Sequence, residues 1–272
     1  MSATTSTFEI TPRRGAPPGA GRSDEDGAAV VETHTAVLVF IGDRVHKLKK
    51  PVDLGFVDFT RREQREEACR AEVELNRRLA PDVYLGVEDV IGIDGAVSDH
   101  LVAMRRLPAD RRLSTMVRRG EDVGTALDEV AAQIAGLHRR TPPDPAWHHV
   151  GEVEAQLAIW REGAATVAPL LDTDRDRARW ADLTQLAGRY LEGRRRLLEA
   201  RIAAGRVRDG HGDLQADDTF LLDDGPRILD ALEFDPRYRW GDGLADAAFL
   251  AMDLERLGRR DLADRFLDAY GR

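Results

Sequence analysis

Cysteine, lysine and long apolar runs are scarce in this sequence of 272 residues. Because Cys69 is the only cysteine, a disulfide framework and a cysteine zinc site are both excluded. No apolar run approaches the roughly 20 residues that a membrane-spanning helix needs. The N-terminus lacks the basic and then apolar pattern of a signal peptide. We therefore expect a soluble, cytoplasmic protein with no membrane partner.

The charge balance is acidic. The formal net charge is −9, and a phosphate backbone needs a basic face, so we expect no nucleic-acid partner. Hydrophobic residues make up 42% of the chain, which is enough for the core of one large domain or of a two-lobed unit.

Arginine carries almost all of the positive charge. The 40 basic residues include only three lysines, Lys47, Lys49 and Lys50, which fall within four consecutive positions. A lysine ammonium is a compact point charge that suits a phosphate group, so this cluster indicates an anion-binding strand. The alternative is a chance cluster on a solvated strand.

The pattern along the chain predicts two lobes. Residues 1–27 are rich in Ser, Thr, Gly, Pro and charge, which is typical of a disordered arm. Residues 28–107 predict a β-rich N-lobe with one helix. Residues 108–272 predict a helical C-lobe with a late β-hairpin. The expected fold class is therefore α+β and bilobal, with the smaller lobe first.

The N-lobe elements follow from periodicity and turn signals. The predicted strands are residues 36–41, 44–50, 87–93 and 97–105. Asp94-Gly95 is a strong hairpin signal between the last two. Residues 60–79 predict a helix with Thr60 as its N-cap and Glu63 completing a capping box.

Glu72 interrupts the apolar stripe of this helix, which continues through Leu75 and Leu79. A buried carboxylate is costly unless it is paired. The obvious partner is a lysine on the neighbouring strand, where Lys47 and Lys49 face the same way. Alternatively, Glu72 lies at the edge of the stripe and reaches water.

Three aspartates frame the late hairpin. Asp213 follows His211-Gly212, Asp218 lies five residues later, and Asp230 follows the second short strand. Phosphoryl transfer needs a carboxylate at the acceptor hydroxyl, oxygen ligands for Mg²⁺ and cations on the phosphates. The spacing of Asp213 and Asp218 matches the Asp-x-x-x-x-Asn of the kinase catalytic loop. The alternative is an acidic, solvated turn.

His211-Gly212-Asp213-Leu214, followed by Asp218 and Ile228-Leu229-Asp230, resembles the catalytic core of the aminoglycoside phosphotransferase family, which is related to choline kinases and protein kinases. Residues 45–51 and Glu233-Phe234 resemble a bacterial branch of predicted kinases in that family. Some members of this branch carry a P-loop domain after the kinase-like part. The resemblance runs from about residue 31 to residue 270 and implies a protein-kinase-like fold.

The resemblance implies roles for four acids. Asp213 corresponds to the catalytic-loop aspartate that accepts a hydrogen bond from the acceptor hydroxyl or orients it. Asp218 and Asp230 correspond to the two Mg²⁺ ligands, and Glu233 lies close enough to assist.

The resemblance also implies a nucleotide site. Glu72 corresponds to the helix glutamate that pairs with a strand lysine; Lys49 is our first choice for that lysine, and Lys47 is the alternative. Met104 to Leu107, before Pro108, resembles the hinge that borders the adenine, and Met104 and Arg105 are the candidate binding residues there.

The sequence departs from the family pattern at three points. Gln215 stands where the family often has histidine, and Asp218 stands where it usually has asparagine. No well-formed glycine-rich loop precedes Ala36, and a GxxxxGK[ST] P-loop is absent, which disfavours a P-loop kinase.

The leading hypothesis is an ATP- and Mg²⁺-dependent O-phosphotransferase, a kinase, that acts on a small hydroxylated molecule such as an aminoglycoside, a sugar or an amino alcohol. One alternative is a catalytically weak or inactive kinase-like module that binds nucleotide and regulates. Another is a metal-dependent phosphohydrolase, which would not explain the lysine strand or Glu72. The acceptor, the nucleotide preference and the oligomeric state are left open.

Overall fold

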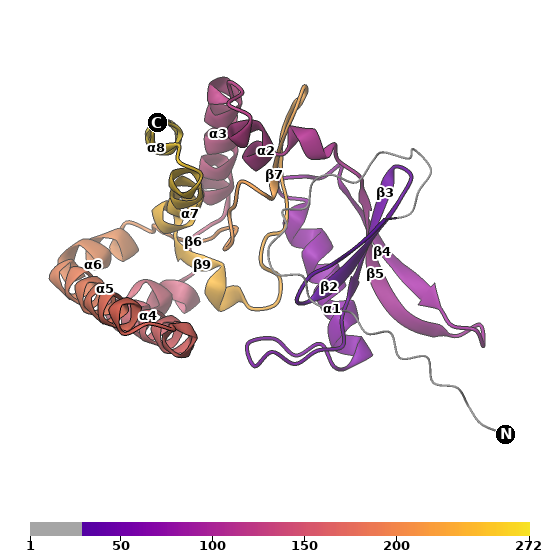
Figure 1. The fold of residues 1–272 in the computed structure, drawn as a ribbon, viewed down its shortest axis with the longest axis horizontal. Coiled ribbons are helices and arrows are strands. Elements are labelled where there is room, and N and C mark those ends of the chain that lie inside the picture. The colour runs from indigo at the N-terminus through magenta and orange to yellow at the C-terminus, as the bar shows by residue number, and fades with distance from the viewer. Residues whose placement is uncertain (1–28) are drawn as a thin grey trace.

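A computed structural model describes residues 29–272 of the chain, and the predicted arm of residues 1–27 lies outside them. The described chain forms two lobes, a strand-rich lobe and a larger helical lobe (Figure 1). The predicted α+β, bilobal fold class is confirmed.

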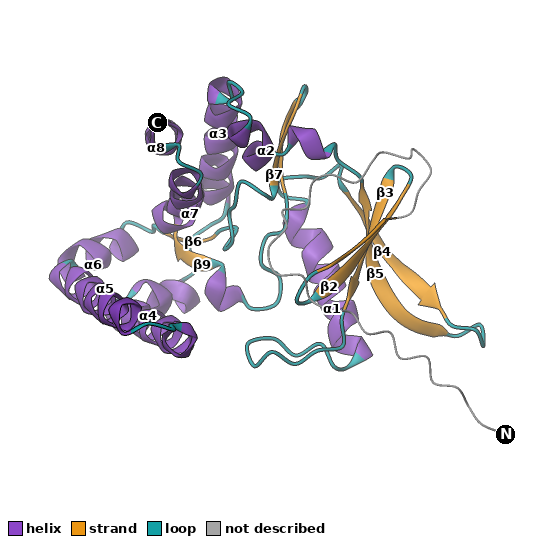
Figure 2. Cartoon of the chain, viewed as in Figure 1, coloured by secondary structure: helices purple, strands orange, loops and turns teal. Residues whose placement is uncertain are grey.

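The N-lobe is an antiparallel sheet of five strands in the order β1-β2-β3-β5-β4. The strands are β1 (Ala29–Glu32), β2 (Ala36–Ile41), β3 (Arg44–Lys49), β4 (Tyr84–Ile91) and β5 (Val97–Arg105). Helix α1 (Arg62–Asn76) packs on one face of this sheet (Figure 2). Because side chains alternate along a strand, Val45, Lys47 and Lys49 of β3 all point toward this helix.

The predicted start of helix α1 is wrong. The N-cap is Arg61 rather than Thr60, and the side chain of Gln64 accepts a hydrogen bond from the Arg61 backbone N–H at 3.0 Å. The Thr60 hydroxyl donates instead to Asp58, at 2.6 Å, which holds it in the preceding turn. A threonine hydroxyl that bonds a neighbouring side chain is not available to cap a helix, and here the bond to Asp58 takes the place of the cap.

The C-lobe consists of helices and two small sheets. Its helices are α2 (Leu113–Arg118), α3 (Gly124–Arg140), α4 (Val153–Val167), α5 (Asp174–Gly193), α6 (Arg195–Ala203), α7 (Gly243–Arg256) and α8 (Arg260–Tyr270). Its strand pairs are β6 (Val207–Asp209) with β9 (Trp240–Asp242), and β7 (Thr219–Leu222) with β8 (Gly225–Ile228).

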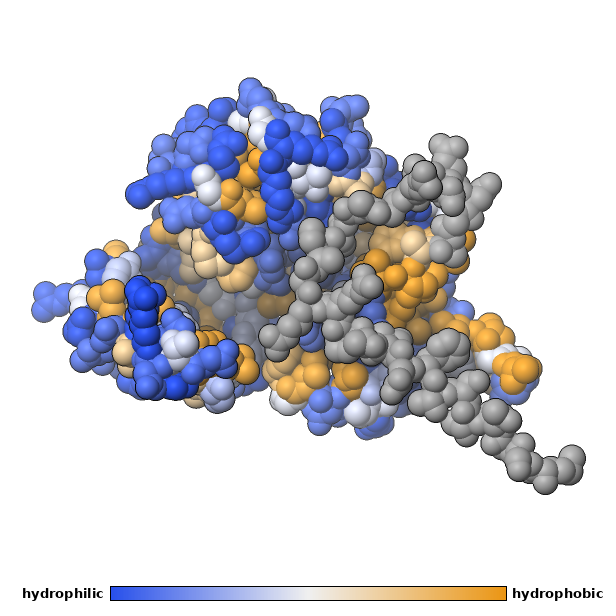
Figure 3. All heavy atoms as spheres, in the orientation of Figure 1, coloured by the Kyte–Doolittle hydropathy of each residue, from blue (hydrophilic) through white to orange (hydrophobic). Residues whose placement is uncertain are grey.

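The main core lies where α3, α7 and α8 pack together against the β7–β8 hairpin. Ile134, Leu250 and Phe266 are fully buried there, one from each helix. Polar and charged residues cover most of this lobe on the face in Figure 3, whereas apolar residues gather over the N-lobe sheet. Within residues 29–272, no helix has both the length and the apolar character needed to cross a bilayer.

Replacing Phe266 with alanine should lower the free energy of unfolding by about 3–5 kcal/mol, because it removes a fully buried aromatic ring and leaves a cavity. Urea denaturation of the purified chain measures this change. Leu170→Ala, at a residue that is 73% exposed, is the control and should cost under about 0.5 kcal/mol. Equal losses in the two variants would contradict this assignment of the core.

Candidate active site

A cavity of about 730 Å³ lies between the two lobes. Apolar residues of the N-lobe sheet form its roof, among them Leu38, Val45 and Met104. Leu229 closes it from the C-lobe side, and Lys47, Asp218 and Asp230 lie close to one another on its wall. The lining charged residues include Lys47, Arg112, Asp217, Asp218 and Asp230. A volume of this size fits a small ligand.

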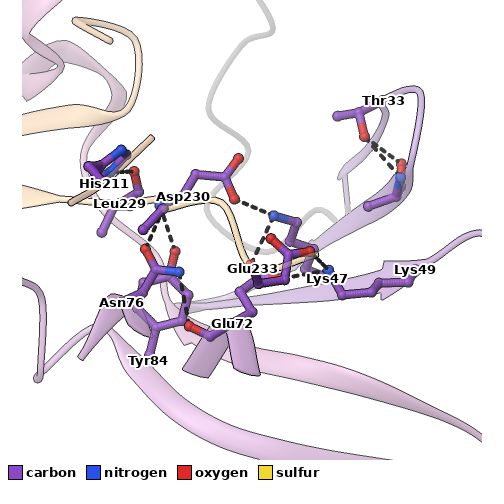
Figure 4. A network of polar contacts seen from close by, with 12 residues as sticks. Thr33, Lys47, Lys49, Glu72, Asn76, Tyr84, His211, Leu229, Asp230 and Glu233 are labelled. Carbon is purple, nitrogen blue, oxygen red and sulfur yellow. Dashed lines mark hydrogen bonds and ion pairs between the residues drawn. The ribbon is translucent and has the colours of Figure 1, made fainter. Parts of the chain in front are cut away.

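Glu72 is completely buried and pairs with both candidate lysines. Its Oε1 accepts from Lys47 Nζ at 2.8 Å, and its Oε2 accepts from Lys49 Nζ at 2.8 Å (Figure 4). Lys47 also donates to Asp230 Oδ1 at 2.5 Å, and Lys49 donates to Glu233. The sequence alternative in which Glu72 reaches water is therefore excluded. Only Lys47 lines the cavity, so the two lysines are not equivalent.

The charges of this cluster stabilise one another. Burial alone would raise the pKa of Glu72, but the ammonium groups of Lys47 and Lys49 lower it to about 2. Burial opposes the charge of Lys47, and the carboxylates of Asp230 and Glu72 outweigh it and raise the pKa of this lysine. Burial opposes the charge of Lys49 as well, and Glu72 and Glu233 outweigh it and raise the pKa of this lysine. Glu72, Lys47 and Lys49 therefore all stay charged at neutral pH, in a site where an unpaired charge would be costly.

Asp230 is held in an unusual backbone conformation. Its φ of 65° is left-handed, which is uncommon for a residue with a side chain. Its backbone N–H donates to the buried Tyr84 hydroxyl at 3.1 Å, and the N–H of Ala231 donates to Asn76 Oδ1 at 2.8 Å (Figure 4). Asn76 in turn donates to the Glu72 carbonyl oxygen. Helix α1 and strand β4 thus fix the position of the Asp230 carboxylate.

His211 holds the segment around Asp213 through hydrogen bonds. His211 is buried; its Nε2 donates to the Leu229 carbonyl at 2.9 Å, and its Nδ1 accepts from the Asp213 N–H at 3.3 Å. These two bonds require a neutral ring, and burial lowers the pKa of His211 in agreement. Gln215 donates to Asp213 Oδ1 at 2.7 Å, so the residue that departs from the family pattern touches the catalytic candidate.

Asp246, in the first turn of helix α7, also holds the segment that carries Asp213. Its two carboxylate oxygens accept the backbone N–H groups of His211 and Gly212, at 2.9 and 2.8 Å. The φ of Gly212 is 87°, and a Cβ at this position would lie 2.9 Å from the Tyr238 carbonyl oxygen. The segment therefore needs glycine here.

Asp218 carries the most strongly raised carboxyl pKa at the cavity. Burial and the nearby charge of Asp230 raise it to about 7, although Arg112 and Lys47 oppose this shift. Burial also raises the pKa of Asp213, and Asp230 adds to that shift. Asp230 thus lies close enough to Asp213 and Asp218 to disfavour their ionised forms, and a cation between these groups would relieve the repulsion.

The donor set is suited to Mg²⁺ held jointly with phosphates. Within residues 29–272, no group of three or more His, Cys, Asp or Glu side chains is arranged to hold a metal ion alone. Mg²⁺ is usually bound by one or two carboxylates together with substrate phosphates and water, which matches Asp218 and Asp230. Glu233, the third candidate ligand, pairs with Lys49 and does not line the cavity.

The predicted hinge also borders the cavity. Met104 and Arg105 line it together with residues 106–108, which connect the sheet to the helical lobe. The residues predicted to form the hinge therefore all line the interlobe cavity.

Sequence reasoning assigned no role to Asn76, Tyr84 and Asp246. The structure uses all three to hold the loops that carry Asp230 and Asp213. Asp246 offered one weak signal, since it is an acid in the first turn of helix α7. Asn76 and Tyr84 offered none, because their contacts depend on residues far away in the chain.

Asp218→Asn should stabilise the protein more at pH 8 than at pH 5, by a difference of about 2 kcal/mol. The pKa of Asp218 is about 7 in the folded protein, against an ordinary value of 3.8, so Asp218 costs stability as the pH rises between these values. The cost is fully present above pH 7, and asparagine avoids it. Thermal unfolding at both pH values measures the effect. Asp224→Asn in the exposed β7–β8 turn is the control, and an equal gain at both pH values would refute the shift.

No protein-family model matches the chain. Uncharacterized proteins of Mycobacterium tuberculosis and Mycobacterium bovis are 43% identical to it over 248 residues, which cover 91% of this chain and 50% of theirs. The chain therefore spans about half the length of the curated relatives it matches.

Two solved structures share its architecture. A choline kinase from Cryptosporidium parvum aligns with a TM-score of 0.54 at 14% identity, covering 92% of this chain and 73% of its own. A choline/ethanolamine kinase family protein from Mesorhizobium loti aligns with a TM-score of 0.52 at 12% identity, covering 92% and 71%. The resemblance noted from the sequence is thus confirmed at the level of the fold: this chain has the protein-kinase-like fold of the choline and ethanolamine kinases.

Proposed function

We propose that the protein is a cytoplasmic, ATP- and Mg²⁺-dependent O-phosphotransferase that acts on a small hydroxylated molecule. The observation that carries this proposal is the convergence of Lys47, Asp218 and Asp230 on the wall of the interlobe cavity, with Glu72 holding Lys47 from behind. Cations for phosphates and oxygen ligands for a metal are the groups that phosphoryl transfer requires.

The cavity offers distinct surroundings to the two ends of a nucleotide. A base would lie against the apolar roof at Leu38 and Val45, near the backbone of residues 104–107. The phosphates would reach Lys47, whose ammonium exchanges its bond to Asp230 for one to phosphate oxygen. ATP or another nucleoside triphosphate fits this division, and Mg²⁺ would neutralise phosphate charge beside Asp218 and Asp230.

Asp213 is the candidate catalytic residue. Its side-chain carboxylate accepts a hydrogen bond from Gln215, and its second oxygen would accept one from the acceptor hydroxyl. As the hydroxyl oxygen bonds to the γ-phosphorus and the bond to the leaving diphosphate breaks, Asp213 takes up the hydroxyl proton. The raised pKa of Asp213 makes it a better proton acceptor than an exposed aspartate.

A nucleotide-binding module without transferase activity is the second candidate. The Lys47–Asp230 ion pair favours it, because the two groups are committed to each other before any ligand arrives. The two candidates share the cavity and differ only in turnover.

Asp213→Asn should lower kcat for ATP-dependent phosphorylation of an accepted substrate by about 10²–10⁴-fold, because the amide cannot accept the proton. Nucleotide affinity should change by less than about threefold, since Asp213 does not line the nucleotide cavity. A coupled ADP-release assay over a panel of amino alcohols, sugars and aminoglycosides measures turnover. Asp224→Asn is the control of equal charge change. Unchanged turnover in Asp213→Asn would remove the transferase proposal, and binding of ATP without turnover by any acceptor would favour the module.

Lys47→Gln and Lys49→Gln should separate the roles of the two lysines. Each variant removes one partner of Glu72, so both should unfold at a lower temperature. Only Lys47 lines the cavity, so Lys47→Gln should weaken ATP·Mg²⁺ binding by at least about tenfold, and Lys49→Gln by less than about threefold. Calorimetric titration measures both affinities. A larger loss in Lys49→Gln would show that Lys49 is the phosphate-binding lysine.

A further inference from the structure

A second charged pocket lies in the C-lobe, away from the interlobe cavity. It has a volume of about 420 Å³ and is walled by α3, the end of α6, strand β6, the start of α7 and the end of α8. Its charged lining consists of Arg139, Arg201, Arg206, Arg208, Arg272 and Asp242, together with His138. None of these residues lines the cavity at Lys47, so the two spaces are separate.

The charge of this pocket runs against that of the whole chain. Five arginines face a single carboxylate, in a protein whose net charge is −9. The carboxylate is already neutralised, because both oxygens of Asp242 accept from Arg201 and Oδ1 also caps the start of helix α7. The remaining guanidinium groups are therefore not balanced by acids of the pocket itself.

Two of these arginines are available to a ligand. Within residues 29–272, the side chains of Arg139 and Arg206 form no ion pair, and both residues are exposed. Arg208 donates to the Thr141 carbonyl at 2.8 Å, which fixes its side chain and leaves its charge unpaired. Several guanidinium groups thus line one pocket, and one of them is held in place; arginine binds phosphate oxygens through paired N–H groups of this kind.

The inner wall of the pocket is polar and ordered. Tyr270 hydroxyl bonds His138 Nδ1 at 2.9 Å, and His138 Nε2 bonds Asp246 at 2.9 Å. A Cβ on Gly243 would lie 2.8 Å from His138 Nδ1 and 2.9 Å from the Tyr270 hydroxyl, so these groups pack closely against the start of helix α7. Because Asp246 also holds His211 and Gly212, this wall is shared with the catalytic loop.

We propose that this pocket binds a small phosphate-bearing anion, at a site distinct from the interlobe cavity. The class of ligand follows from the lining, since the pocket offers several guanidinium groups and its volume suits a phosphorylated small molecule. The proposal does not depend on kinase activity, because the pocket contains none of the residues assigned to phosphoryl transfer.

The test is calorimetric titration of the full chain with pyrophosphate, without nucleotide and without Mg²⁺. Arg139→Ala/Arg206→Ala should weaken binding by at least about tenfold, because two charge-assisted contacts are lost. Both residues are exposed and unpaired in the described chain, so the fold should be unaffected, which thermal unfolding checks. Binding should also weaken as NaCl is added. Tyr270 and His138 are unsuitable as probes, because changing them would disturb the catalytic loop as well.

Two controls locate the site. Arg189→Ala/Arg196→Ala removes the same charge from exposed positions on α5 and α6 outside the pocket and should bind pyrophosphate as the unaltered chain does. Lys47→Gln should also leave the affinity within about threefold. Loss of binding in Lys47→Gln alone would place the anion in the interlobe cavity and overturn the proposal. Absence of binding to the unaltered chain at on the order of 10 mM pyrophosphate would overturn it as well.

Discussion

The burial of the Glu72 carboxylate is the constraint on which the rest of the site depends. A charge removed from water must be compensated within the protein, and here two ammonium groups on one strand do this from opposite oxygens. Each lysine also donates a hydrogen bond to a second carboxylate, Lys47 to Asp230 and Lys49 to Glu233. A single buried acid on α1 thereby ties the sheet to the loop that follows β8, so the two lobes meet through paired charges as well as through apolar contact.

This network also explains what a ligand must do on arrival. Lys47 is bonded to Asp230 on the cavity wall, so phosphates and a cation would take over partners that the two residues now provide for each other. Lys49 is more deeply buried, and its Nζ lies 5.1 Å from the centroid of the Phe59 ring, so it has no comparable freedom. One lysine can therefore exchange its partner while the other keeps Glu72 compensated.

The sequence predicted the pairing of Glu72 with a strand lysine, but it did not predict the residues that hold the Asp230 loop in place. Lysine is rare in this chain, and helical periodicity placed Glu72 on a buried face, so the pairing could be expected. Strand alternation puts Lys47 and Lys49 on the same side, however, and cannot say which one faces a cavity. The supports Tyr84 and Asn76 lie 146 and 155 positions from the backbone groups they bind. Contacts between residues so distant in the chain leave no local sequence pattern. Strands β6 and β9 have three residues each and pair with each other although they are not consecutive in the chain, so they were not predicted either.

The aspartate at position 218, where the related kinases usually have asparagine, bears on the choice between the proposed transferase and the inactive module. An asparagine there would offer an oxygen to Mg²⁺ without adding charge, whereas Asp218 adds a carboxyl group whose pKa of about 7 reflects burial and Asp230. Near neutral pH this group is ionised in only part of the molecules, and a cation that binds nearby would favour its ionised form. Metal and nucleotide would then gain a charged oxygen ligand. Under the proposed function, Asp218 is therefore compatible with catalysis and would make metal binding depend on pH, which an asparagine would not do.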